Sequence, residues 1–94
     1  MYKMAFFKNN KEVKINLEEI SYFKNDLIIQ KETEDHIIIL DFKNKRCSLK
    51  IDEVKMDIPI LSMNFKQENN QDIFTYTLVT EPEIKNTIII LQKR

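Results

Sequence analysis

The chain of 94 residues contains no glycine and no tryptophan, and it has one cysteine and two prolines. Without glycine it cannot form a glycine-rich phosphate-binding loop, which needs glycine so that the backbone can approach the phosphates. With Cys47 as the sole cysteine, it can form neither an internal disulfide nor an all-cysteine zinc site. We therefore expect no cofactor and no metal.

The lack of glycine also constrains the turns. Tight turns between strands require residues with positive φ, and glycine usually fills those positions. Asparagine tolerates the left-handed region better than other residues, and the chain has nine asparagines. We therefore expect asparagine in the left-handed positions, with Asn44 as the residue of positive φ in its turn.

Neither sign of charge is in excess, since fifteen basic residues balance fifteen acidic ones. A neutral chain without a basic half argues against nucleic acid as the main partner, because that affinity depends on neutralising phosphates. Residues 1–11 lack the apolar run of a signal peptide. No apolar stretch is longer than four residues, as at residues 37–40, which is far too short to span a membrane. We expect a cytoplasmic protein.

The hydrophobic residues that are present favour β-structure. Isoleucine outnumbers leucine by 15 to 7, phenylalanine and tyrosine add nine residues, and Ala5 is the one alanine. Branched and aromatic side chains suit a pleated sheet, whereas helical domains use alanine and leucine.

Apolar and polar residues alternate along most of the chain, which is typical of strands with one wet face. The firmest hairpin joins residues 36–42 to residues 47–51, and its first strand is apolar enough to be buried on both faces. A second firm strand covers residues 73–79. The remaining predicted strands are residues 2–7, 13–17, 20–22, 27–32, 58–65 and 87–91, with breaks at 25–26, 33–35, 52–55, 69–71 and 81–83.

Two segments are ambiguous. The stretch from Leu17 to Phe23 fits a strand, but Asn16 followed by Glu19 resembles a helix cap, and Leu17, Ile20 and Phe23 have helical spacing. Pro59 lies inside a predicted strand although it cannot donate a ladder hydrogen bond. It therefore belongs at an edge, a strand start or a bulge.

These patterns predict one all-β domain over residues 1–94. Short turns require antiparallel neighbours, so we expect a meander of eight to nine short strands. Such a sheet curls under its twist into a small closed or partly open barrel. The alternative is an open sheet that pairs with a second copy of the chain.

The residues with chemical potential have ordinary structural interpretations. His36, the one histidine, lies in a turn and is expected on the surface, and Cys47 is expected as a small core residue. Lys43, Lys45 and Arg46 gather beside Phe42 at a hairpin tip, which suits either a charged turn or a contact with RNA. We predict no catalytic residue.

One stripe of side chains is expected inside the barrel. Phe74, Tyr76 and Leu78 share a face of their strand, and Cys47 faces the same interior. An eight-stranded barrel is either filled by such side chains or holds one small ligand. These four residues are therefore the candidates for a ligand-binding lumen.

The second half of the chain carries a family resemblance. Asp57-Ile58-Pro59-Ile60, a polar turn at residues 69–72 and the strand at residues 73–78 resemble the end of the YwiB-like bacterial proteins. Those are small calycin-like, that is lipocalin-like, β-barrels of uncharacterised function. The likeness covers residues 36–93 and implies a barrel without implying an activity. This chain is shorter and lacks the glycines that those proteins carry in their turns.

Two functions follow as expectations. The first is a non-enzymatic β-barrel that binds a small amphipathic ligand or a protein partner. The second is an interaction module that forms a homodimer through an exposed edge strand. An enzyme that uses dispersed carboxylates with His36 is the third and least favoured hypothesis.

Overall fold

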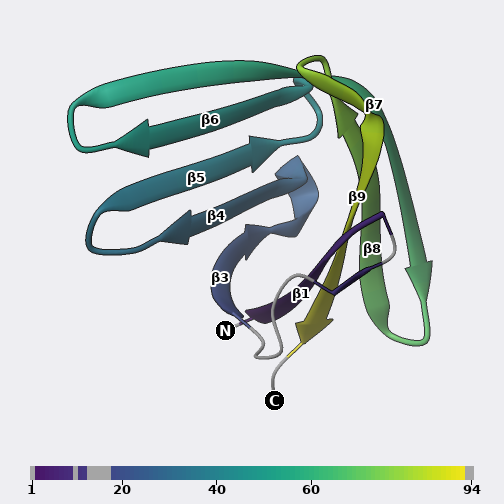
Figure 1. Ribbon diagram of the computed structural model, residues 1–94. Helices are drawn as coiled ribbons and strands as arrows, with labels where there is room; N and C mark the ends of the chain where they lie inside the picture. The colour runs from purple at the N-terminus through teal and green to yellow at the C-terminus, as the bar shows by residue number, and fades with distance from the viewer. Residues whose placement is uncertain (1, 10, 13–17, 93–94) are drawn as a thin grey trace.

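The computed structural model describes residues 2–9, 11–12 and 18–92 of the chain (Figure 1). These residues form nine strands and one short 3₁₀ segment. The elements are β1 (Tyr2–Lys8), β2 (Lys11–Glu12), β3 (Glu18–Phe23), η1 (Lys24–Asp26), β4 (Ile28–Glu32), β5 (His36–Asp41), β6 (Arg46–Ile51), β7 (Val54–Glu68), β8 (Gln71–Leu78) and β9 (Glu81–Gln92). No helix in this part of the chain is long and apolar enough to cross a membrane.

Eight of the strands close into an antiparallel barrel. From β3 to β9 each strand pairs with the next along the chain, and β1 lies between β3 and β9. The closing ladder runs from Tyr2 opposite Gln92 to Lys8 opposite Asn86, and Figure 1 shows these two strands side by side. The short β2 pairs with the end of β1. The predicted all-β meander barrel is confirmed.

Aromatic rings fill the interior of the barrel. Phe74 is fully buried at its centre and stacks on Phe42 with 4.4 Å between ring centroids. The rings of Phe65 and Tyr22 lie against Phe74 at 4.8 Å and 6.0 Å. Tyr76 is also buried, so the stripe predicted from the alternation of β8 does point inward. The other buried apolar residues are Ile20, Ile29, Leu40, Ile60, Ile88 and Ile90.

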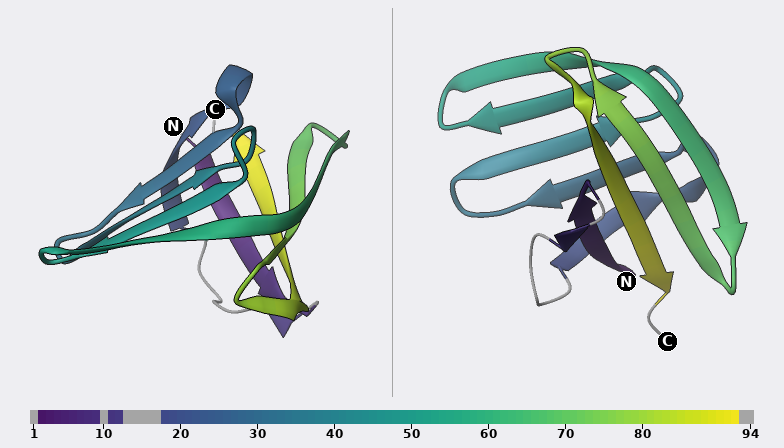
Figure 2. Two further views of the ribbon diagram at one scale, coloured as in Figure 1. Left: turned by 90° about the horizontal axis from the view of Figure 1, so that it is seen from above. Right: turned by 45° about the vertical axis from the view of Figure 1, so that its right-hand side comes forward.

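One side of the sheet extends beyond the barrel. The first half of β7 pairs with β6, and its second half pairs with β8 after a bulge between Ile60 and Ser62. We call the projecting ends of β4, β5 and β6, together with residues 54–59 of β7, the wing; it projects to the left in Figure 1 and in the left view of Figure 2. Because the wing leaves the barrel, only Leu40 of the apolar run in β5 is buried and Ile37 to Ile39 are half-buried.

The ambiguous segment before η1 is extended. Residues 18–23 form β3, which pairs with β1 and β4, so the helical alternative is wrong for them. The backbone N–H and C=O groups of β3 bond to β1 and β4, whereas in a helix they would bond to one another. Leu17 and the strand predicted over residues 13–17 lie outside the described residues. The break predicted at residues 25–26 is η1, which ends at Leu27 in the left-handed conformation.

Asparagine supplies only part of the left-handed turn positions. Asn9, Asn69 and Asn70 have positive φ, but so do Leu27, Lys45 and Asp52. The prediction for Asn44 is wrong, because the fourth residue of that turn, Lys45, is the left-handed one. Asn44 instead donates its backbone N–H and its side-chain amide to the Asp41 carboxylate, at 3.2 and 2.8 Å.

Two predicted boundaries change for reasons of pairing. Residues 54–55 belong to β7 because they pair with Ile51 and Lys50, so the turn is shorter than predicted. Residues 81–83 belong to β9, whose register with β8 shifts between Tyr76 and Leu78. Pro59 lies beside the bulge of β7, as predicted.

Replacing Phe74 with alanine should remove the centre of the core. We expect Phe74→Ala to lower the free energy of unfolding by about 3–5 kcal/mol, because it deletes a ring that contacts three other rings. Urea denaturation followed by circular dichroism measures the change. Leu61→Ala, at an exposed position in the bulge, should stay within about 0.5 kcal/mol. A loss below about 1 kcal/mol for Phe74→Ala would contradict a filled core.

Candidate functional site

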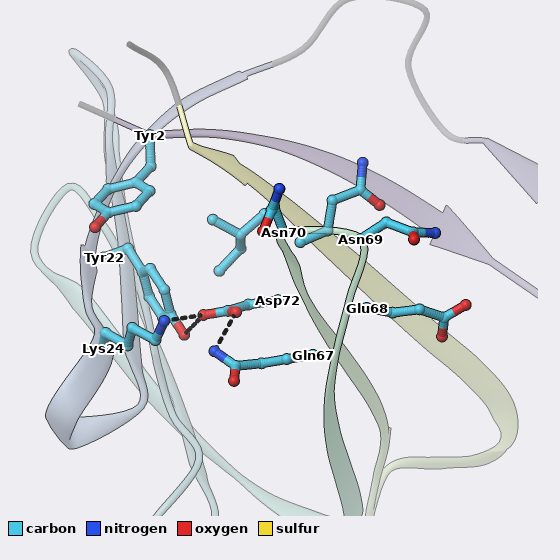
Figure 3. Close-up of a pocket in the computed structure, with 10 residues that line it drawn as sticks. Tyr2, Tyr22, Lys24, Gln67, Glu68, Asn69, Asn70 and Asp72 are labelled. Atoms are coloured by element: carbon cyan, nitrogen blue, oxygen red, sulfur yellow. Dashed lines mark hydrogen bonds and ion pairs between the residues drawn. The ribbon is translucent and has the colours of Figure 1, made fainter.

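A depression of about 590 Å³ opens at one end of the barrel, between β3 and the hairpin that joins β7 to β8 (Figure 3). One wall is largely apolar and consists of Tyr2, Tyr22 and Ile90. The two tyrosine rings meet edge to face, with centroids 5.2 Å apart. The opposite wall is polar and includes Gln67, Asp72 and the side chains of the turn between them.

The carboxylate of Asp72 lies at the centre of this pocket. The hydroxyl of Tyr22 donates a hydrogen bond of 2.6 Å to Oδ2, and Nε2 of Gln67 donates one of 2.9 Å to Oδ1. Nζ of Lys24 lies 3.8 Å from Oδ2. Figure 3 shows the three side chains converging on Asp72 from β3, η1 and β7. The carboxylate therefore joins parts of the chain that lie about fifty residues apart in sequence.

The position of Asp72 follows from local geometry. Asn69 and Asn70 form the two-residue turn before β8, with φ of 52° and 63°. Positive φ at both residues is the geometry of a tight hairpin. Because the turn is tight, β8 begins directly after it, and its side chains alternate between the inner and outer faces from there. Asp72 then faces inward on the same side as Phe74 and Tyr76. Sequence reasoning missed Asp72, although a carboxylate in phase with an inward aromatic stripe is a usable signal.

Burial keeps the Tyr22 hydroxyl protonated, and the charged side chains of the pocket give it a weak negative potential. Burial, followed by the hydrogen bond to Asp72, raises the pKa of Tyr22, so its hydroxyl remains a donor at neutral pH. Asp72 and Glu68 carry negative charge and Lys24 carries positive charge. These three side chains leave one net negative charge on the walls.

The polar groups at the centre of the pocket are bonded to one another. The Asp72 carboxylate accepts two hydrogen bonds and lies near one ammonium group, and Tyr22 holds its proton firmly. Among the described residues, no group of three or more histidine, cysteine or acidic side chains is placed to hold a metal ion. The site can orient polar groups of a bound molecule beside the tyrosine rings.

The lumen residues suggested by the sequence lie deeper than the pocket. Phe74 belongs to the ring cluster, Leu78 packs half-buried against it, and neither lines the pocket. Tyr76 lines a shallower depression of about 320 Å³ next to Pro82. Cys47 is half-buried against the core, and burial raises the pKa of its thiol. The structure thus brings these side chains together as part of the core.

Neither His36 nor the basic hairpin lines the pocket. Nδ1 of His36 lies 2.9 Å from Oδ1 of Asp35, whose side chain is 78% exposed, and the hydrogen bond lowers the pKa of Asp35. At the hairpin, Phe42 turns into the core and is 1% exposed. Lys43 donates to the backbone carbonyl of Asn25 at 2.6 Å. The buried ring of Phe42 therefore offers no exposed aromatic surface next to the lysines of this turn.

Comparisons with known proteins add no assignment. No family model, no curated protein and no solved structure matches the chain.

The two buried tyrosines make the free energy of unfolding decrease at alkaline pH. Burial raises the pKa of Tyr22 and of Tyr76 above the ordinary value of about 10. The unfolded chain therefore releases protons that the folded protein retains. This stabilisation is complete below about pH 10 and is lost as the pH rises further.

The prediction is tested by urea denaturation at increasing pH. A variant with Tyr22→Phe and Tyr76→Phe should lose less unfolding free energy above about pH 10 than the wild type does. Both proteins carry the same lysines, so their difference isolates the tyrosines. Equal losses in the two proteins would contradict the prediction.

Proposed function

We propose that this protein is a non-enzymatic β-barrel that binds a small amphipathic molecule in the pocket around Asp72. The observation that carries the proposal is the two-sided lining of the pocket. Tyr2, Tyr22 and Ile90 form an apolar wall in which the half-buried Tyr2 is the most exposed side chain, while Asp72 and Gln67 face it with polar atoms. Binding sites for small molecules combine such a wall with a few placed polar groups.

The charge of the walls selects the polar part of the ligand. Asp72 and Glu68 outnumber Lys24, so a group that carries positive charge or donates hydrogen bonds is favoured over an anion. The half-buried ring of Tyr2, which meets the buried Tyr22 edge to face, suits an aromatic or cyclic apolar part of the ligand. We therefore assign the ligand to the class of small amines with a flat apolar group.

Two further expectations belong to this proposal. The closed meander barrel supports the likeness to the YwiB-like calycin-like proteins, and barrels of that kind often bind small apolar molecules. The absence of an internal disulfide supports a cytoplasmic location.

A titration with a simple amine tests the proposal. Phenethylamine should produce saturable shifts of the amide resonances of Tyr22, Asn70 and Asp72 in heteronuclear NMR spectra. Hydrocinnamate has the same ring and linker with the opposite charge, and it should bind more weakly. Asp72→Asn retains an acceptor for Tyr22 but removes the charge, and it should weaken binding of the amine about tenfold.

The matched control is Asp52→Asn. It removes the same charge from the turn between β6 and β7, and asparagine suits the φ of 54° at that position. Binding of phenethylamine should be unchanged in this variant. Shifts that do not saturate, or equal affinity for the amine and the acid, would contradict the proposed ligand class.

A further inference from the structure

The first half of β7 leaves an unpaired sheet edge. Residues 54–59 pair with β6 on one side, and pairing with β8 on the other side begins at Ile60. No other described strand pairs with residues 54–59, so their second edge faces solvent at the top of Figure 1. Apart from the half-buried Ile58, these residues are exposed. The edge lies in the wing, away from the Asp72 pocket.

The ladder geometry identifies the free backbone groups. The N–H of Ile60 donates to Lys45 on the β6 side, and the carbonyl of Pro59 accepts from Val79 on the β8 side. Backbone groups alternate between the two edges of a strand, so Lys55 and Asp57 point both their N–H and their C=O away from β6. Pro59 has no N–H, and it therefore ends the free edge.

The side chains of this segment are arranged symmetrically about Met56. Val54, Met56 and Ile58 share one face of the strand, which we call the inner face. Lys55 and Asp57, on either side of Met56 in sequence, share the opposite, outer face. Within the chain, Lys55 stands directly opposite Lys50, and Asp57 stands opposite Ser48. Lys55 thus faces a like charge in its own sheet, which is unfavourable.

We propose that two copies of the chain pair through this edge, antiparallel and about a two-fold axis at Met56. In this register Lys55 lies opposite Asp57 of the partner subunit, and Asp57 lies opposite Lys55 of the partner subunit. Both pairs are hydrogen-bonded positions, and each exchanges its two backbone bonds, so every free group of Lys55 and Asp57 is satisfied. Each lysine also gains the opposite charge that its own sheet does not provide.

The inner face favours the same arrangement. Val54, Met56 and Ile51 are 64%, 45% and 45% exposed, and they lie on one face with the half-buried Ile38 and Leu49. Edge pairing places Met56 beside Met56 of the partner subunit and Val54 beside Ile58 of the partner subunit. It therefore joins two apolar surfaces into one. A closed interface of this kind is self-complementary, as two-fold symmetry requires.

Charge reversal provides the decisive experiment. Lys55→Asp places two carboxylates opposite each other in both pairs, and Asp57→Lys places two lysines opposite each other. Each variant should raise the dimer dissociation constant about tenfold or more in analytical ultracentrifugation. An equimolar mixture of the two variants restores an acid opposite a lysine in every pair, so it should form a heterodimer at the wild-type dissociation constant.

Circular dichroism checks that each variant folds. Lys55→Asp also removes the like charge that stands opposite Lys50 within the chain. Amide exchange in the wild type is an independent measurement. The amides of Lys55 and Asp57 should become protected as the protein concentration rises, while those of Met56 and Ile58 are protected throughout. A wild type that stays monomeric up to its solubility limit, or a mixture that does not associate, would overturn the proposal.

Discussion

The ladder between β1 and β9 is the contact on which the rest of the structure depends. It joins the two ends of the described chain over seven residue pairs and turns a meander into a closed barrel. Closure also builds the pocket, because Tyr2 comes from β1 and Ile90 from β9. Without this ladder, both outer strands would expose unpaired backbone and the aromatic core would open to water.

The barrel divides into a filled interior and a polar end. Phe42, Phe65 and Phe74 occupy the space that a larger barrel would leave to a ligand. Space for a ligand therefore remains at the rim, where Asp72 interrupts the inward aromatic stripe of β8. A buried carboxylate is costly unless it is hydrogen-bonded, and Tyr22 and Gln67 meet that requirement. The same contacts that stabilise the barrel end define the chemistry of the pocket.

The length of β7 separates the Asp72 pocket from the unpaired edge in the wing. β7 is long enough to serve the wing with its first half and the barrel with its second half. The bulge between Ile60 and Ser62 turns the strand from one partner to the other, so each half is paired on one side only. The unpaired edge of residues 54–59 lies in the wing. The proposed ligand site and the proposed edge interaction therefore lie in different parts of one chain.

The sequence by itself determined the strands, because alternation with a period of two reports locally which side of a sheet each residue faces. It thus predicted β5, β6, β8 and the inward direction of Phe74 and Tyr76. It also favoured antiparallel pairing and a barrel. Only the tertiary structure decided that Lys45 carries the left-handed turn and that β7 serves two partners. The pocket likewise required Tyr22 to meet Asp72 across fifty positions, and no local pattern encodes a contact at that distance.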